Sequence, residues 1–179
     1  TESFFSSPPP TLAPMAVPWM ASFDPFTLTG PARYRAPPPP ALTSDVYTAD
    51  YNEVKGTGAL TNSTRTAAQT DIAYFWTDNF AVQWNRAIRE IVSQHVRRIG
   101  DRARLFALAN LAGADALITA WDSKKHYFFW RPVTAIRNGE LDGNPDTAGD
   151  SEWQSLVNNP NYPDYTSGAN NITGAMTRT

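Results

Sequence analysis

The chain has 179 residues, of which 41% are hydrophobic and 18% are charged, so it is long enough for one globular domain with a buried core. Its net charge of -2 argues against the uniformly basic surface of a general nucleic-acid binder, and no nucleic-acid partner is expected. With no cysteine and only two histidines, it cannot form disulfides, a thiolate zinc site or a histidine-rich centre, so no metal ligand is assigned.

Proline dominates the start of the chain, where eleven of the fifteen prolines fall within residues 1–40. Because proline fixes its own backbone and keeps the preceding residue extended, this region is predicted to be an extended arm. For the first twenty residues, a flexible extension is the alternative. Four apolar side chains of the arm are expected to hold it against a neighbouring surface: Phe23, Phe26, Leu28 and Tyr34.

Helical signals follow in chain order from residue 41. Thr43 or Ser44 can cap a first helix that ends near Gly56. Apolar spacing predicts a second helix over about 64–76 and a third over about 82–97. The sustained alternation typical of an exposed strand is missing from these segments, so the fold class is predicted to be all-α. One face of the third helix is expected to carry Trp84, Ile88, Ile91, Val92 and His95.

The strongest helical signal begins at Asp101, a candidate N-cap, and continues to Trp121. Ala, Leu, Ile and Phe occupy nearly every face of this segment. Helices of this kind are normally buried against several others, so it is predicted to be the spine of a helical bundle. The sequence contains no run of 18 uninterrupted apolar residues, and we expect no membrane span.

Two cations lie among large aromatic residues just after this segment. Lys124 and Arg131 are seven residues apart, so on a continuous helix they would differ by about 20° in direction and about 10 Å along the axis. Pro132 suits the first position of a new helix, which puts Arg131 at a break where its planar fork can bind two oxygens of one anion. The alternative is that both cations pair with carboxylates such as Asp115, Asp122 or Asp164.

The two histidines are not predicted to share that anion. His126 differs by about 200° from Lys124 on a helix, and it is expected to pack or to form a hydrogen bond. His95 is expected to lie at the C-terminal end of a helix. Lys125 is expected to be solvated.

A second candidate anion site lies at Ser167-Gly168, after turn signals at Pro163 and Asp164. A Ser-Gly pair at a helix start offers free backbone N–H groups, a hydroxyl donor and the positive end of the helix dipole, which together suit a phosphate-like anion. The alternative is that Ser167 is only a helix cap.

The two features together resemble the first two signature motifs of the vanadium-dependent haloperoxidase and type 2 phosphatidic acid phosphatase superfamily. The motifs are Lys124, six residues, Arg131-Pro132, and then Thr166-Ser167-Gly168-Ala169 after 33 more residues. The haloperoxidase-like branch is favoured by the segments at 40–44, 51–55, 72–76 and 116–137. The resemblance covers roughly residues 25–179.

The resemblance implies an α-helical bundle of the vanadium haloperoxidase and acid phosphatase type that binds vanadate, or phosphate in its place. By analogy, Lys124 and Arg131 would bind oxyanion oxygens, and Ser167 and the Gly168 amide would donate hydrogen bonds to them. The implied activity is oxidation of a halide by hydrogen peroxide. An acid phosphatase acting on a phosphate ester is the alternative.

The sequence departs from the family pattern in three places. Thr166 replaces the usual proline, and Ala169 occupies the position of the acid–base histidine. The third motif, with its Arg and His, does not occur before Thr179. Residues 41–179 are therefore expected to be the N-terminal part of an oxyanion-binding bundle that a second chain or a C-terminal segment completes.

A non-catalytic homologue is a second alternative, because Ala169 stands where the family has the imidazole of its acid–base histidine. We expect a secreted or periplasmic protein, because the sequence has no initiator Met and starts with a proline-rich arm, and because members of the family it resembles are often exported.

Overall fold

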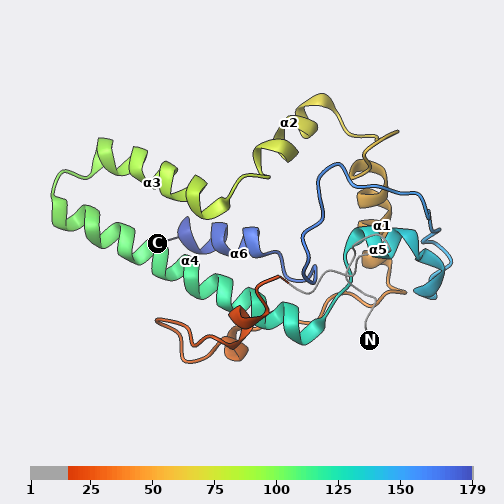
Figure 1. The fold of residues 1–179 in the computed structure, drawn as a ribbon, viewed down its shortest axis with the longest axis horizontal. Coiled ribbons are helices and arrows are strands. Elements are labelled where there is room, and N and C mark those ends of the chain that lie inside the picture. Colours follow the sequence, from red (N-terminus) through yellow and green to blue (C-terminus); the bar gives the residue numbers. More distant parts are fainter. Residues whose placement is uncertain (1–15, 179) are drawn as a thin grey trace. The chain divides into compact units, whose positions relative to one another are not determined.

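A computed structural model describes residues 16–178, and within them the secondary structure is helical, as the sequence predicts. No strand forms in this range (Figure 1). An isolated bridge joins Ala59 and Ser155. The chain divides into two compact units. Unit 1 contains Pro37–Phe75 and Tyr127–Tyr165, and unit 2 contains Pro18–Ala36, Trp76–His126 and the segment from Thr166 onward. The predicted boundary at residue 40 stays a prediction.

Unit 1 is built around two helices that pack together, α1 (Asp45–Thr57) and α5 (Pro132–Arg137). Ser44 caps α1 as expected, because its side chain accepts a hydrogen bond from the Tyr47 N–H. The unit also contains α2 (Ala67–Phe75) and the 3-10 helix η3 (Gly139–Leu141). Its core combines four aromatic side chains, Tyr47, Tyr51, Trp130 and Trp153, with aliphatic ones that include Val133 and Ile136.

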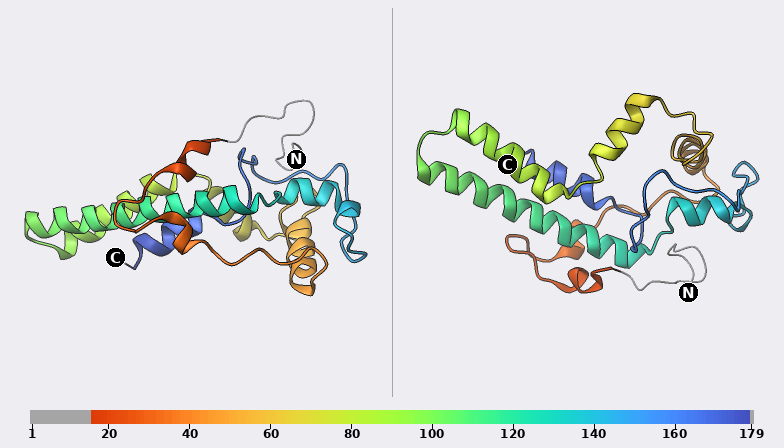
Figure 2. Two further views of the ribbon diagram at one scale, coloured as in Figure 1. Left: turned by 90° about the horizontal axis from the view of Figure 1, so that it is seen from below. Right: turned by 45° about the horizontal axis from the view of Figure 1, so that its top comes forward.

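Unit 2 contains α3 (Phe80–His95), most of α4 (Ile99–Tyr127) and α6 (Gly168–Met176), which lie side by side (Figures 1 and 2). Trp84 of α3 donates a hydrogen bond from Nε1 to Thr173 Oγ1 of α6 at 2.9 Å. A Cβ on Gly113 of α4 would lie 3.0 Å from Met176 Cγ, so the missing side chain lets α6 approach closely. The core of unit 2 consists of Ile88, Val92, Ala109, Ile172 and Met176.

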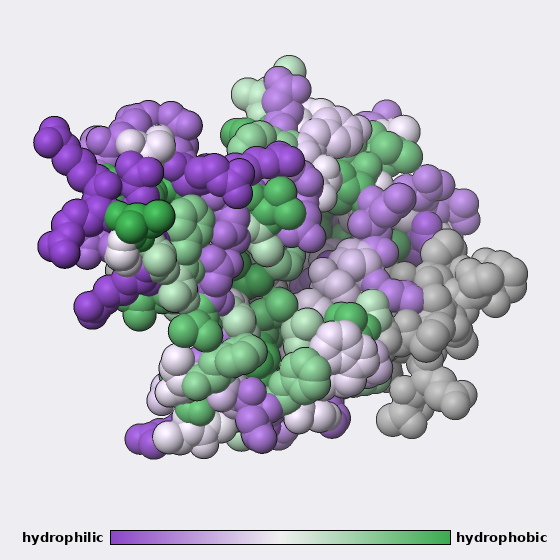
Figure 3. All heavy atoms as spheres, turned by 60° about the vertical axis from the view of Figure 1, so that its left-hand side comes forward, coloured by the Kyte–Doolittle hydropathy of each residue, from purple (hydrophilic) through white to green (hydrophobic). Residues whose placement is uncertain are grey.

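The spine prediction for α4 holds for its second half. The helix begins at Ile99 rather than at Asp101, and its buried residues start at Ala109. Ile99 is 85% exposed, and on α3 Ile91 is 57% exposed although it was expected on the face of Ile88. Apolar side chains therefore reach the surface among hydrophilic ones, as Figure 3 also shows.

Polar contacts, rather than aromatic side chains, hold residues 18–36 on α4. This segment forms two short 3-10 helices, η1 (Pro18–Ser22) and η2 (Pro31–Tyr34). The backbone N–H groups of Phe26 and Thr27 donate to the Asp115 carboxylate at 2.6 and 2.8 Å. Arg35 makes a bidentate ion pair with Asp122.

The expectation that apolar side chains anchor the arm was wrong for its three aromatic residues. Phe23, Phe26 and Tyr34 are exposed, whereas Leu28 is half-buried. The remainder of the predicted arm, residues 1–15, lies outside the described residues.

The segment Ile99–Arg137 is long and apolar enough to cross a membrane by length and composition alone. Core helices of soluble proteins meet the same criterion. Two charged side chains inside the segment, Asp115 and Lys124, are almost fully buried in the fold. The expected absence of a membrane span stays a prediction.

Candidate functional site

Arg131 lies at a helix break, as the sequence predicts. Helix α4 ends at Tyr127, and Phe128 turns the chain with a φ of 50°, a left-handed conformation that is uncommon for a bulky residue. Arg131 is the N-cap residue of α5, and Pro132 follows at its first position. Because the two helices are not continuous, the calculated offset of 20° and 10 Å from Lys124 does not apply.

The Arg131 guanidinium is held on three sides within unit 1. Nη1 donates to the Tyr162 carbonyl at 3.2 Å, and Nη2 lies 3.3 Å from Asp164 Oδ1. Its Cζ stands 5.2 Å from the centroid of the Tyr162 ring, within the range of a cation–π contact. The expected alternative of carboxylate pairing is therefore confirmed for Arg131, with Asp164 as the partner.

One donor of this guanidinium has no acceptor among the described residues. The side chain is only 14% exposed, and its Nε is buried and makes no hydrogen bond within the described residues. A buried N–H without an acceptor costs free energy, so an acceptor that bound beside Nε would recover that cost.

The loop that carries the Arg131 partners is hydrogen-bonded to the backbone just before Arg131. The Asp164 backbone N–H donates to the Phe129 carbonyl at 3.0 Å, and Pro163 beside it is fully buried. Burial raises the pKa of the Tyr162 hydroxyl, so this side chain stays neutral beside the cation. Sequence reasoning missed Tyr162 as a partner of Arg131, and its only signal was its position two residues before Asp164.

Lys124 occupies the last turn of α4 and is the most deeply buried cation in the described chain, with 1% of its surface exposed. Its Nζ lies 5.8 Å from the centroid of the Trp121 ring. The carboxylates of Asp115 and Asp122 bind the arm through Thr27 and Arg35. Burying an ammonium group is costly unless charge or hydrogen bonds compensate it, so a lysine at this position needs a polar environment.

Ser167 and Gly168 form the start of α6, as predicted. Ser167 is the N-cap residue, and its Oγ accepts from the Asn170 N–H at 3.2 Å, which confirms the cap interpretation. A Cβ on Gly168 would lie only 3.0 Å from Trp121 Cζ3. The Trp121 ring therefore contacts both the start of α6 and the Lys124 ammonium group.

The histidines and Ala169 offer no acid–base group to these residues. His95 ends α3 and is exposed, which agrees with the expectation for it, and His126 and Lys125 are exposed on α4. Ala169 is the second residue of α6, so no imidazole projects from that turn. Within residues 16–178, no group of three His, Cys, Asp or Glu side chains is arranged to bind a metal ion.

The four candidate oxyanion ligands are divided between the two units. Lys124, Ser167 and Gly168 belong to unit 2, whereas Arg131 belongs to unit 1. Their assignment to a single site stays a prediction.

Comparison with known proteins identifies the family. A family model described as the VCPO second helical-bundle domain matches residues 104–179. The chain is 30% identical over 172 residues to a vanadium chloroperoxidase from Curvularia inaequalis, in an alignment that takes in 77% of this chain. This chain is a homologue within the vanadium haloperoxidase family.

The haloperoxidase-like fold extends over nearly the whole chain. The crystal structure of the first bacterial vanadium-dependent iodoperoxidase matches 97% of it with a TM-score of 0.77 and 24% sequence identity. The chain spans 28% of the chloroperoxidase and 43% of the iodoperoxidase chain. The resemblance found in the sequence is thus confirmed for the family and for the fold.

Proposed function

We propose that this haloperoxidase homologue supplies part of a vanadate-binding site in a protein that oxidises a halide with hydrogen peroxide. The proposal is supported by the similarity to a chloroperoxidase and by the Lys124, Arg131 and Ser167-Gly168 motifs. The proposal goes beyond family membership, because it names a cofactor, vanadate, and a reaction, halide oxidation.

The buried Nε of Arg131 is the observation that carries the proposal. Nη1 and Nη2 already have protein acceptors, whereas Nε has none in the part of the chain that the structure describes. A tetrahedral oxyanion offers strong acceptors that satisfy such a donor. Phosphate is also a tetrahedral oxyanion, so the chemistry of Arg131 fits either ion.

The residues of this chain would bind and orient the ion. Arg131 would donate from Nε, and Lys124 would place a desolvated positive charge near an oxygen. The N–H groups at the start of α6 would add donors at the positive end of the helix dipole. The chemistry that vanadate supplies when bound is Lewis-acid activation of hydrogen peroxide toward a halide.

Ala169 favours a second candidate, a homologue that binds the ion without turning over. No side chain of the first α6 turn can move a proton at that position. Binding and catalysis are therefore tested separately.

The test uses the full-length protein, with vanadate binding followed by isothermal titration calorimetry. The Arg131→Ala variant is expected to weaken binding at least about tenfold, because it removes a charge-assisted hydrogen bond. Arg104→Ala is the matched control, since Arg104 is exposed on α4. Equal affinity of both variants for vanadate would contradict the proposal.

Activity assays then separate the candidate reactions. Halogenation of a dye with bromide, peroxide and vanadate is expected for a haloperoxidase, and p-nitrophenyl phosphate hydrolysis for an acid phosphatase. Vanadate binding with neither activity would identify a non-catalytic homologue.

A further inference from the structure

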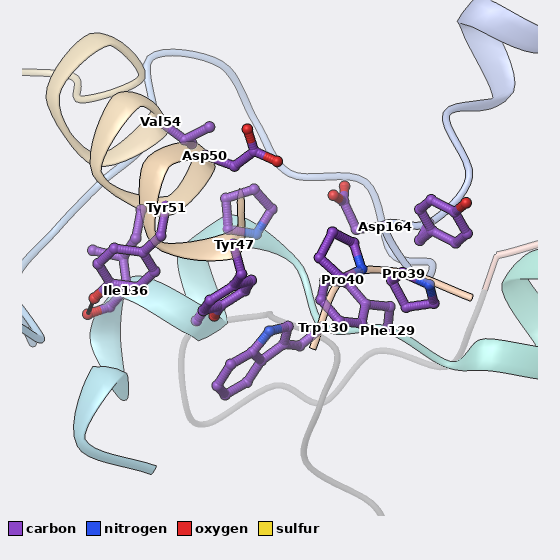
Figure 4. Close-up of a pocket in the computed structure, with 13 residues that line it drawn as sticks. Pro39, Pro40, Tyr47, Asp50, Tyr51, Val54, Phe129, Trp130, Ile136 and Asp164 are labelled. Carbon is purple, nitrogen blue, oxygen red and sulfur yellow. Dashed lines mark hydrogen bonds between the residues drawn. The ribbon is translucent and has the colours of Figure 1, made fainter. Parts of the chain in front are cut away.

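A pocket of about 370 Å³ lies in unit 1 beside α1 and the start of α5 (Figure 4). Pockets of this size bind molecules of one or two rings. Aromatic side chains make up much of the lining: Tyr47, Tyr51, Phe129, Trp130 and Tyr165.

Two of the lining rings contact each other, and two of the lining tyrosines have hydroxyl groups that donate to backbone carbonyls. Tyr47 and Phe129 meet edge to face, with ring centroids 6.5 Å apart and planes at 86°. The Tyr51 hydroxyl donates to the Ala148 carbonyl at 2.9 Å, and the Tyr165 hydroxyl donates to the Pro37 carbonyl at 2.8 Å. These two tyrosines therefore offer π surface to a ligand while their O–H groups are used elsewhere.

The charged residues that line the pocket are both acidic. Asp50 comes from α1 and Asp164 from the loop before α6, and no Lys, Arg or His is among the described lining residues. Figure 4 shows the two carboxylates near the same space, above the Trp130 and Phe129 rings. Asp50 is exposed and makes no ion pair within the described residues.

We propose that this pocket binds a small organic cation with a flat aromatic body, namely an arylalkylammonium ion. The two carboxylates attract the ammonium group, and the faces of the aromatic rings attract a positive charge through their quadrupoles. The flat body of the ligand fits between Pro40 and the rings, where apolar surface predominates.

The surrounding groups strengthen the preference for a cation. Burial, together with the nearby Asp142 carboxylate, raises the pKa of Tyr51 to about 12. The same two causes raise the pKa of Tyr47. Both hydroxyls are thus neutral at physiological pH. Of the two lining carboxylates, Asp164 also pairs with Arg131, so the negative charge that no ion pair of the described residues offsets is that of Asp50.

This site goes beyond the proposed oxyanion chemistry and does not require it. Its single shared residue is Asp164, which also pairs with Arg131. Ligand binding can be measured without vanadate, peroxide or halide, so a failure of one proposal leaves the other standing.

The experiment is calorimetric titration of the full-length protein with tryptamine, and separately with indole-3-propionate, which carries a similar ring and the opposite charge. Tryptamine is expected to bind at least about tenfold more tightly, because only its charge complements the pocket. Equal affinities, or no binding of tryptamine at millimolar concentration, would overturn the proposal.

Two variants on α1 provide the matched comparison. Asp50→Asn removes a pocket carboxylate and is expected to weaken tryptamine binding about threefold to tenfold. Glu53→Gln makes the same charge change at an exposed position outside the pocket and is expected to leave the affinity unchanged. An equal effect of the two variants would show that general surface charge, not the pocket, attracts the ligand. Circular dichroism verifies that each variant is folded.

Discussion

The Arg131 guanidinium pairs with the Asp164 carboxylate, with 3.3 Å between Nη2 and Oδ1. Asp164 is itself fixed, because its backbone N–H donates to the Phe129 carbonyl two residues before Arg131. The loop before α6 thereby orients a cation at the start of α5. Together with the Tyr162 carbonyl, this pairing leaves Nε as the guanidinium nitrogen without an acceptor within residues 16–178.

Arg131→Lys is expected to weaken vanadate binding about tenfold with little change in thermal stability. A lysine keeps the positive charge but cannot reach the Tyr162 carbonyl, Asp164 and an oxyanion at once, because it lacks the planar fork. Calorimetric titration with vanadate measures the affinity, and differential scanning calorimetry measures the stability. Wild-type affinity in this variant would mean that charge alone, not the guanidinium geometry, matters.

Gly168→Ala is expected to lower the stability of the fold by about 1–3 kcal/mol, because the new methyl would crowd the Trp121 ring. Gly174→Ala is the matched control on the same helix, since a Cβ there meets nothing within 4 Å. The control is expected to be neutral or stabilising by up to about 1 kcal/mol, because alanine favours a helix. Urea unfolding of both variants checks the difference, and similar values for the two would refute the crowding argument.

Asp115→Asn is expected to destabilise the protein by about 1–3 kcal/mol at neutral pH, through loss of charge-assisted hydrogen bonds. Although burial raises the pKa of Asp115, hydrogen bonds from Thr27 and Phe26 outweigh it and lower this pKa below its usual value. The carboxylate therefore stabilises the fold above its unfolded pKa of about 4, and this contribution is lost as the pH falls through the folded pKa.

The effect of Asp115→Asn on stability should depend on pH. The stability difference between wild type and Asp115→Asn should shrink as the pH falls below about 4. Asp101→Asn removes an exposed carboxylate from the same helix and should show a much smaller difference at neutral pH. Limited proteolysis reports the arm directly, with faster cleavage within residues 18–36 expected only for the Asp115 variant.

The sequence predicted features whose causes are local. Ser44 and Ser167 were expected at helix starts because a hydroxyl caps the free N–H groups nearby, and both cap helices in the structure. The break before Pro132 was predictable from proline chemistry, and it places Arg131 at the N-cap.

Features that depend on distant residues could not be predicted in the same way. The contacts of Asp115 with Thr27 join positions 88 residues apart, and nothing in the local pattern near either residue specifies them. Apolar spacing identified a face on α3 but not which of its members are covered, so the exposure of Ile91 was missed. The Nε of Arg131 is another case, because an unsatisfied donor is visible only once its neighbours have been placed.

Ala169→His tests whether the missing imidazole limits the reaction. The residue lies in the first turn of α6, next to Gly168, so an imidazole there would stand beside the proposed oxyanion ligands. Dye bromination with vanadate and peroxide is expected to rise about 10²-fold or more, in line with the usual contribution of general acid–base catalysis. The added activity should follow the ionisation of an imidazole, changing most steeply near pH 6–7.

Ala169→Gln is the control for that variant, because glutamine adds a polar side chain of similar length that does not titrate in this range. Bromination by this variant should stay at the wild-type level. If histidine and glutamine gave the same rate, proton transfer at position 169 would not be the missing function. If wild type, Ala169→His and Ala169→Gln also bound vanadate equally well, the role of α6 would be to bind the oxyanion. The group that transfers the proton would then lie outside α6.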